Sequence, residues 1–225
     1  VGAVGAAWIF SKESIIENNL NFLSFGKLRS SYGTTGNDQI GDYQYLSTFQ
    51  PAGVAYQSVV GLSPTKLYNP NFAWEVNKKF EAAMDLGFLQ DRIFISTSYY
   101  LNRSSNQLVN YPLAMTTGFT GVLANLNATV QNAGWEFVVN TMNIKKNDFA
   151  WNTSLNWTIP TNKLVAFPNL QTSTYANKYV IGQPLTVSKR YTYTGVDPTT
   201  GVYQFQDYNN DGSITTADKL KIENV

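Results

Sequence analysis

The chain has 225 residues, enough for one β domain or two small ones. It contains no cysteine and no histidine, which excludes disulfides, Ser-His-Asp or Cys-His catalysis, and metal sites built from thiolates or imidazoles. Only 14% of the residues are charged, against a globular norm of roughly 25%. The net charge of +1 gives no basic excess, so we expect no nucleic-acid partner.

Alternation of apolar and polar side chains with period two dominates the chain and predicts β-strands. In chain order the predicted strands are 1–10, 27–32, 80–88, 92–102, 134–141 and 149–159. The last is the clearest. Phe149, Trp151, Leu155, Trp157 and Ile159 share one face, and the other face is small, polar and uncharged. A polar face without charge is typical of a hydrated lumen.

The predicted connections alternate in length. Tight turns are expected at Leu89–Arg92 and Lys145–Asp148, and a moderate join at about 11–20. The other connections are long, at about 34–73, about 103–131 and everything after Pro160. Short turns on one side and long loops on the other, with strands of about ten residues, are the layout of an outer-membrane barrel.

We therefore predict an all-β fold, an antiparallel transmembrane β-barrel that is present only in part. Residues 1–160 would supply about six strands and two long loops, and residues 161–225 a long extracellular loop. Six strands cannot close a barrel with loops of this size, and an open sheet edge is forbidden in lipid. We expect the chain to be a fragment of a much larger barrel.

Oxygen-bearing residues in 207–218 follow the spacing of a calcium loop. The expected ligands are Asp207, Asn209, Asp211, Ser213 (through its carbonyl) and Asp218, with Gly212 at the sharp turn. An ion-free loop of Asx-turns accounts for the same residues. Both interpretations stay open, with calcium as the candidate cofactor.

A different interpretation of the whole chain is a secreted β-sandwich carbohydrate-binding module with a calcium loop. It shares the aromatic residues and the Asp207 motif, but it predicts a charged outer face and short loops at both ends. No set of catalytic side chains converges in either interpretation, so we expect no enzyme.

Family motifs run through the chain. Lys27–Asn37 reads K-L-R-S-S-Y-G-T-T-G-N and resembles the K-L-R-x-S-Y-G-x-T-G-N signature of the SusC/RagA family, the TonB-dependent outer-membrane transporters of Bacteroidota. Ile40–Tyr45 continues this signature. Asn69–Glu75 is similar to the family's N-P-N-L-K-W-E, and Gly195–Gly201 with the Asp207 loop resembles a late extracellular loop.

The resemblance implies a place in the bacterial outer membrane, in a plugged barrel of the roughly 22-stranded class. It implies energised import of a glycan or peptide substrate, with a SusD-like surface lipoprotein as a lid and membrane lipid around the wall. It also implies that the plug, the segment that contacts TonB and the final strands lie outside this chain.

Overall fold

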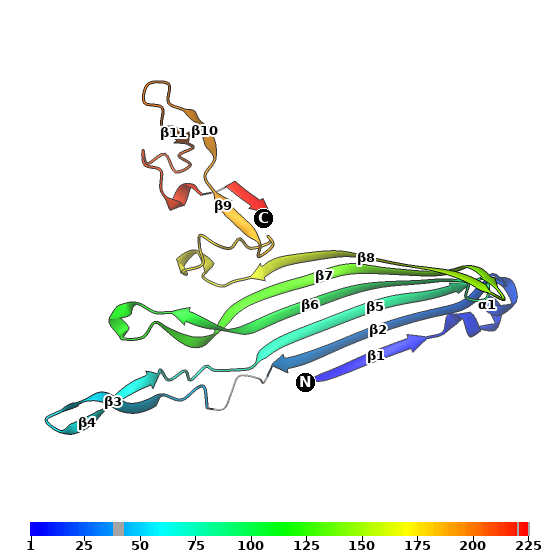
Figure 1. The fold of residues 1–225 in the computed structure, drawn as a ribbon, viewed down its shortest axis with the longest axis horizontal. Helices are drawn as coiled ribbons and strands as arrows, with labels where there is room; N and C mark the ends of the chain where they lie inside the picture. The colour runs from blue at the N-terminus through cyan, green and yellow to red at the C-terminus, as the bar shows by residue number, and fades with distance from the viewer. Residues whose placement is uncertain (38–42, 220, 225) are drawn as a thin grey trace.

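The computed structural model describes residues 1–37, 43–219 and 221–224, and its main body is one six-stranded antiparallel sheet (Figure 1). The strands lie side by side in the order β1-β2-β5-β6-β7-β8. Their bounds are Gly2–Trp8, Leu23–Asn37, Glu75–Phe88, Ile93–Pro112, Gly121–Lys146 and Phe149–Ala166. The prediction of an all-β, antiparallel, partial barrel with about six strands is confirmed.

The connections at the two ends of the sheet differ in length (Figure 1). At one end, called the turn end here, η1 (Phe10–Lys12) and α1 (Ser14–Asn19) join β1 to β2, and tight turns join β5 to β6 and β7 to β8. At the other, the loop end, lie the hairpin of β3 (Thr48–Tyr56) with β4 (Val59–Lys66), the tip of the β6–β7 hairpin with η2 (Met115–Thr117), and the chain after β8. The predicted alternation of short turns and long loops is therefore present.

The tight turn between β5 and β6 is held from both sides. Leu89–Asp91 has three consecutive positive φ angles, of 54°, 57° and 60°, which L-residues adopt only at a cost. The Ser24 hydroxyl donates to Asp91 Oδ1 at 2.7 Å and accepts the Asp91 N–H at 2.9 Å. Arg92 donates to the Met142 carbonyl on β7, at 3.3 Å from Nη2. These bonds stabilise the strained turn and anchor it to its neighbours.

The strands extend beyond their predicted ends at the loop end. The region 103–131, expected to be a long loop, is mostly a continuation of β6 and β7, whose residues stay paired up to Pro112 and Gly121. Likewise β8 continues past the predicted end at Pro160 to Ala166. Period-two alternation marks a strand only where its two faces meet unlike surroundings, so these paired strands continue without that signal in the sequence.

The sheet has two unlike faces. The face that carries Trp135 exposes large apolar side chains, among them Trp8, Leu155 and Trp157, the last two with 63% and 67% of their surface accessible. The opposite face carries polar and charged residues. We call these the outer face and the inner face. A single sheet with so much apolar exposure is the expected form of a barrel wall that faces lipid.

Within the described ranges no second sheet packs on the outer face, as Figure 1 shows. A β-sandwich would bury this face against another sheet, so the alternative of a secreted carbohydrate-binding module is not favoured. None of the helices in the described part of the chain has the length and apolar character needed to cross a membrane.

A small hydrophobic core lies at the loop end. It is formed by Ala128 and Val130 of β7, Leu164 of β8, Phe167, and Leu170 at the start of η3 (Leu170–Thr172). The chain then forms two short strand pairs, β9 (Val187–Arg190) with β12 (Lys221–Asn224) and β10 (Tyr193–Val196) with β11 (Tyr203–Phe205). The last 3-10 helix, η4 (Thr216–Asp218), lies between β11 and β12 in the chain. The region after β8 is thus folded rather than irregular.

Candidate functional site

Three charged residues meet at the centre of the inner face. Arg29 of β2 lies directly opposite Ala83 of β5, between Glu81 and Asp85 on the same strand. The small Ala83 side chain leaves room for the guanidinium, which pairs with Glu81 Oε1 and lies 3.6 Å from Asp85 Oδ2. Ser96 of β6 donates to the other oxygen of Asp85 at 2.6 Å. The two carboxylates therefore belong to one bridged network on the lumen wall, as expected for lining residues rather than a catalytic pair.

A polar groove of about 420 Å³ lies next to this network. Its lining includes Lys79, Glu81, Tyr100, Asn102 and Glu136. Glu136 accepts a long hydrogen bond from Ser98, at 3.4 Å, and has no ion-pair partner within the described ranges. The groove offers hydrogen-bond donors, acceptors and one free carboxylate, which suits contact with a hydrated or peptidic surface.

Gly134 gives Tyr100 its place in this groove. The two residues are directly opposite on β7 and β6. A Cβ at position 134 would lie 2.8 Å from the Tyr100 hydroxyl and 2.8 Å from the Ile159 carbonyl oxygen. Only glycine allows the ring to lie over the strand at this point.

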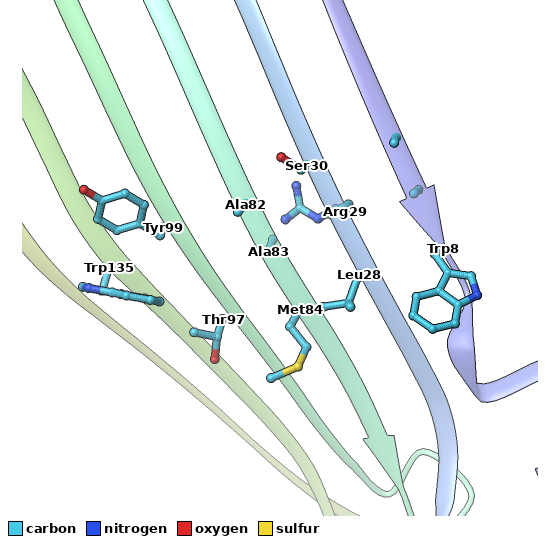
Figure 2. Close-up of a pocket in the computed structure, with 12 residues that line it drawn as sticks. Trp8, Leu28, Arg29, Ser30, Ala82, Ala83, Met84, Thr97, Tyr99 and Trp135 are labelled. Atoms are coloured by element: carbon cyan, nitrogen blue, oxygen red, sulfur yellow. The ribbon is translucent and has the colours of Figure 1, made fainter. Parts of the chain in front are cut away.

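The outer face carries a ladder of aromatic rings. Tyr99, Trp135, Phe137 and Trp157 pack in sequence across β6, β7 and β8, with ring-centroid distances of 5.1, 6.2 and 6.0 Å. Beside the ladder lies an apolar groove of about 520 Å³. Figure 2 shows Tyr99 and Trp135 on one side of it, Trp8 on the other, and the small Ala82 between them.

The five predicted calcium ligands lie in one loop between β11 and β12, and the side chains of four of them accept hydrogen bonds within it. The Gly212 N–H donates to Asp207 Oδ2 at 2.8 Å, and the Asp211 N–H donates to Asn209 Oδ1 at 3.2 Å. The Ser213 N–H donates to Asp211 Oδ1 at 2.8 Å. Gly212 has a φ of +81°, so the predicted sharp turn is present.

Asp218 is fully buried and has a structural role. Its two oxygens accept the N–H groups of Tyr208, at 2.9 Å, and Thr215, at 2.8 Å, and it completes a capping box with Thr215 at the start of η4. The hydrogen bond from the Thr215 N–H, with those from Tyr208 and Asn209, lowers the pKa of Asp218 below its usual value against the opposing effect of burial. These bonds account for Asp218 without an ion.

One carboxylate oxygen of the loop, on Asp207, is left without a hydrogen bond among the described residues. Asp207 Oδ1 is buried and has no hydrogen-bond partner in the described structure. No three acidic side chains of the described ranges come close enough together to form a metal cluster. The geometry therefore fits a calcium ion only in part, and the ion-free turn explains most of the same residues.

The motifs that resemble the SusC/RagA family have structural roles at the loop end. Lys27–Asn37 makes up most of β2. In Asn69–Glu75, the Asn69 side chain donates to the Leu123 carbonyl at 3.0 Å, and the Ala73 backbone exchanges two hydrogen bonds with the Asn125 side chain. This segment therefore fastens the return into β5 to the β6–β7 hairpin. Ile40, Gly41 and Asp42 lie outside the described residues.

Comparison with known families identifies the sheet. Residues 2–220 match the family of TonB dependent receptor-like β-barrels. The chain belongs to this family. This β-barrel membership agrees with the expectation that the protein is not an enzyme.

Two relatives illustrate how this TonB-dependent receptor chain compares with complete ones. TonB-dependent receptor P39 of Formosa agariphila is 30% identical over 92% of the chain, which covers 19% of that relative. TonB-dependent receptor SusC of Bacteroides thetaiotaomicron is 29% identical over 77% of the chain, covering 18% of that relative. The chain thus spans about a fifth of the length of these relatives.

Solved structures share the fold. The RagAB peptide importer in its closed-closed state superposes with a TM-score of 0.73, at 22% identity, over 99% of this chain and 24% of the matched one. The RagAB peptide transporter gives a TM-score of 0.72 at 23% identity over 90% of this chain. The expected likeness to the SusC/RagA family is confirmed at the level of sequence by SusC and at the level of fold by RagAB.

Sequence reasoning missed how the inner-face residues combine. Arg29 was part of a recognised motif, but its bridging of Glu81 and Asp85 depends on the register of β2 against β5. The signal that could have indicated this bridge is Ala83, a small residue with a carboxylate two positions before it and another two positions after it. Its small side chain leaves space for a long side chain from the neighbouring strand.

Proposed function

We propose that this chain forms part of the wall of a TonB-dependent importer in the bacterial outer membrane, and that its cargo is an oligosaccharide or a peptide. The observation that carries the proposal is the two-faced sheet, apolar and exposed outside, polar and charged inside, with turns at one end and folded loops at the other. In such barrels the short turns face the periplasm and the long loops face outward.

In this proposal the segment itself is passive. The outer face contacts lipid, the inner face contacts water, cargo and a plug domain supplied by another part of the protein, and the loop end shapes the entrance. TonB would act through that other part, and a SusD-like lipoprotein would close the entrance above the loops. One of the similar solved structures, RagAB, is described as a peptide importer, which supports a peptide cargo. The likeness to SusC supports the partnership with a SusD-like protein.

The test is uptake by cells that carry the complete protein, compared with a strain that lacks it. Fluorescent pools of oligopeptides and of oligosaccharides are offered separately. We expect uptake of one pool, dependent on TonB and on the proton-motive force, and recovery of the protein in the outer-membrane fraction. Uptake of neither pool, or recovery in the soluble periplasmic fraction, would contradict the proposal.

The Asp207 loop is the candidate calcium site of this protein. The supporting observation is the buried, unpartnered Asp207 Oδ1. Asp207, Asn209, Asp211, the Ser213 carbonyl and Asp218 would hold the ion, which would fix the shape of the loop. Titration calorimetry of the complete protein should show calcium uptake that Asp207→Asn abolishes. Equal heats for both proteins, or none for either, would leave the ion-free turn as the explanation.

A further inference from the structure

A row of cationic side chains crosses the outer face near the loop end. Lys78 of β5 pairs in register with Arg103 of β6, Arg103 with Gln131 of β7, and Gln131 with Lys163 of β8. All four residues lie on the outer face of the sheet, the face that carries the aromatic ladder. At roughly 4.8 Å between strands, the row spans about 14 Å from Lys78 to Lys163. We call Lys78, Arg103 and Lys163 the basic row.

The basic row is exposed and lacks countercharge. All three side chains are solvent-accessible, and none forms an ion pair with another described residue. Arg103 Nε donates to Gln131 Oε1 at 2.9 Å, which fixes the guanidinium over the neighbouring strand. From this row to the turn end, the outer-face positions of the six strands include no Asp or Glu. The row therefore presents an unneutralised positive surface.

The basic row marks one boundary of the apolar belt. The next outer-face residues toward the turn end are Phe80 on β5 and Leu101 on β6. From Lys78 to Phe88 the strand rises about 34 Å at roughly 3.4 Å per residue. With a strand tilt of about 40°, this corresponds to about 26 Å along the membrane normal, close to the typical apolar band of about 25 Å. Because the loop end faces outward, the basic row lies at the headgroups of the outer leaflet.

The apolar groove lies on the same face, farther toward the turn end. Its floor includes Ala82, four residues or about 14 Å of strand from Lys78 on β5, and its walls are Trp8, Tyr99 and Trp135 (Figure 2). A headgroup on the basic row would thus have its acyl chains over a hollow of about 520 Å³.

We propose that the basic row binds the phosphate groups of an anionic lipid in the outer leaflet, with the groove receiving an acyl chain of the same lipid. This inference rests on the proposed outer-membrane location. Charge complementarity and continuity with the lipid-facing belt select this occupant. A second copy of the sheet is a poorer fit, because the belt below the row offers no carboxylate to three cations.

The test uses the complete protein purified in detergent, with bound lipid counted by native mass spectrometry. The probes are diphosphoryl lipid A, the same lipid A without its phosphates, and inorganic phosphate as competitor. At roughly 1 kcal/mol per basic residue, Lys78→Gln/Arg103→Gln/Lys163→Gln should lose about 150-fold in affinity for diphosphoryl lipid A. Each single variant should lose about fivefold. The dephosphorylated lipid should bind both proteins equally weakly.

The matched control removes the same number of charges elsewhere. Lys27 of β2, Lys79 of β5 and Lys145 of β7 lie at inner-face positions, and their triple Gln variant should bind diphosphoryl lipid A as the unmodified protein does. If the triple row variant does not fold, the single variants provide the measurement. The proposal is overturned if the control loses as much affinity as the row variant, if phosphate removal changes nothing, or if inorganic phosphate displaces the lipid at equal concentration. Uptake and outer-membrane fractionation are read separately, so failure of this inference is distinguishable from failure of the proposed function.

Discussion

Substitution of Leu155 by arginine tests which face of the sheet meets lipid. Leu155 is on the outer face of β8, with 63% of its surface exposed, between Phe149 at the turn end and Lys163 in the basic row. It lies about 27 Å of strand from Lys163 and about 20 Å from Phe149 at roughly 3.4 Å per residue. A tilt of about 40° reduces these separations to about 21 and 16 Å along the membrane normal, so Leu155 lies inside the lipid-facing part of β8 rather than at either end of it.

An arginine on a lipid face costs about 2–4 kcal/mol at the midplane and less toward the interfaces, so at Leu155 we expect a cost above about 1 kcal/mol, which is roughly fivefold or more in the folding equilibrium. The matched control is Asn156→Arg, one residue along the same strand but on the inner face, where water solvates the charge and the cost should stay within about 0.5 kcal/mol. The assay is guanidinium unfolding of the complete protein from phospholipid vesicles. Equal costs at the two positions, or no cost at either, would refute the assignment of the faces.

Three further predictions concern particular contacts. Gly134→Ala should destabilise the protein by about 1–3 kcal/mol in the same unfolding assay, because the new Cβ meets the Ile159 carbonyl and the Tyr100 ring; Gly2→Ala, with open space around it, should be neutral. Arg29→Gln should cost less than about 1 kcal/mol, because the pair with Glu81 is solvated, and a loss above about 3 kcal/mol would show that the pair is dry. The pKa of Asp218 is lowered in the folded loop, so its contribution is present above the unfolded carboxyl pKa of about 3.9 and is lost as pH falls through the lower folded value. The protection of the Thr215 N–H from hydrogen exchange, relative to the intrinsic rate at the same pH, should therefore stay high down to about pH 4 and fall below it. In Asp218→Asn it should be low already at neutral pH, and low protection in the unmodified protein at neutral pH would contradict this.

The wall was predictable from the sequence, because the physical requirement is simple and repeated. Lipid on one side and water on the other force period-two alternation, and β8 from Phe149 to Ile159 displays it without interruption. The tight turn at 89–92 was also legible as a short polar break between two alternating runs.

The loop end was less predictable, for two physical reasons. Hairpin strands with similar surroundings on both faces carry no alternation, so the ends of β6 and β7 have no signal in the sequence, and their length depends on their pairing with each other. The β3–β4 hairpin contains Pro51 and Pro64 at places where the register shifts, and proline within a run argues against a strand.

The inner face was predictable in kind but not in detail. Its polar, sparsely charged character follows from alternation alone, whereas the bridge from Arg29 to Glu81 and Asp85 requires the register between strands distant in the chain. At the Asp207 loop, the spacing predicted an ion site and not the capping box in which the structure places Asp218, although the T-x-x-D pattern at Thr215 is a signal for that box.

The central claim is that this sheet separates lipid from water, and a cysteine scan of β8 tests it most directly. These 225 residues contain no cysteine, so once any cysteine elsewhere in the complete protein is replaced, single spin labels can be placed at each position from 149 to 163 in bilayers. We predict that labels at odd positions collide mainly with oxygen dissolved in lipid and labels at even positions mainly with a water-soluble nickel reagent. Equal accessibility of both faces to the water-soluble reagent, or odd positions shielded from both reagents, would contradict the account.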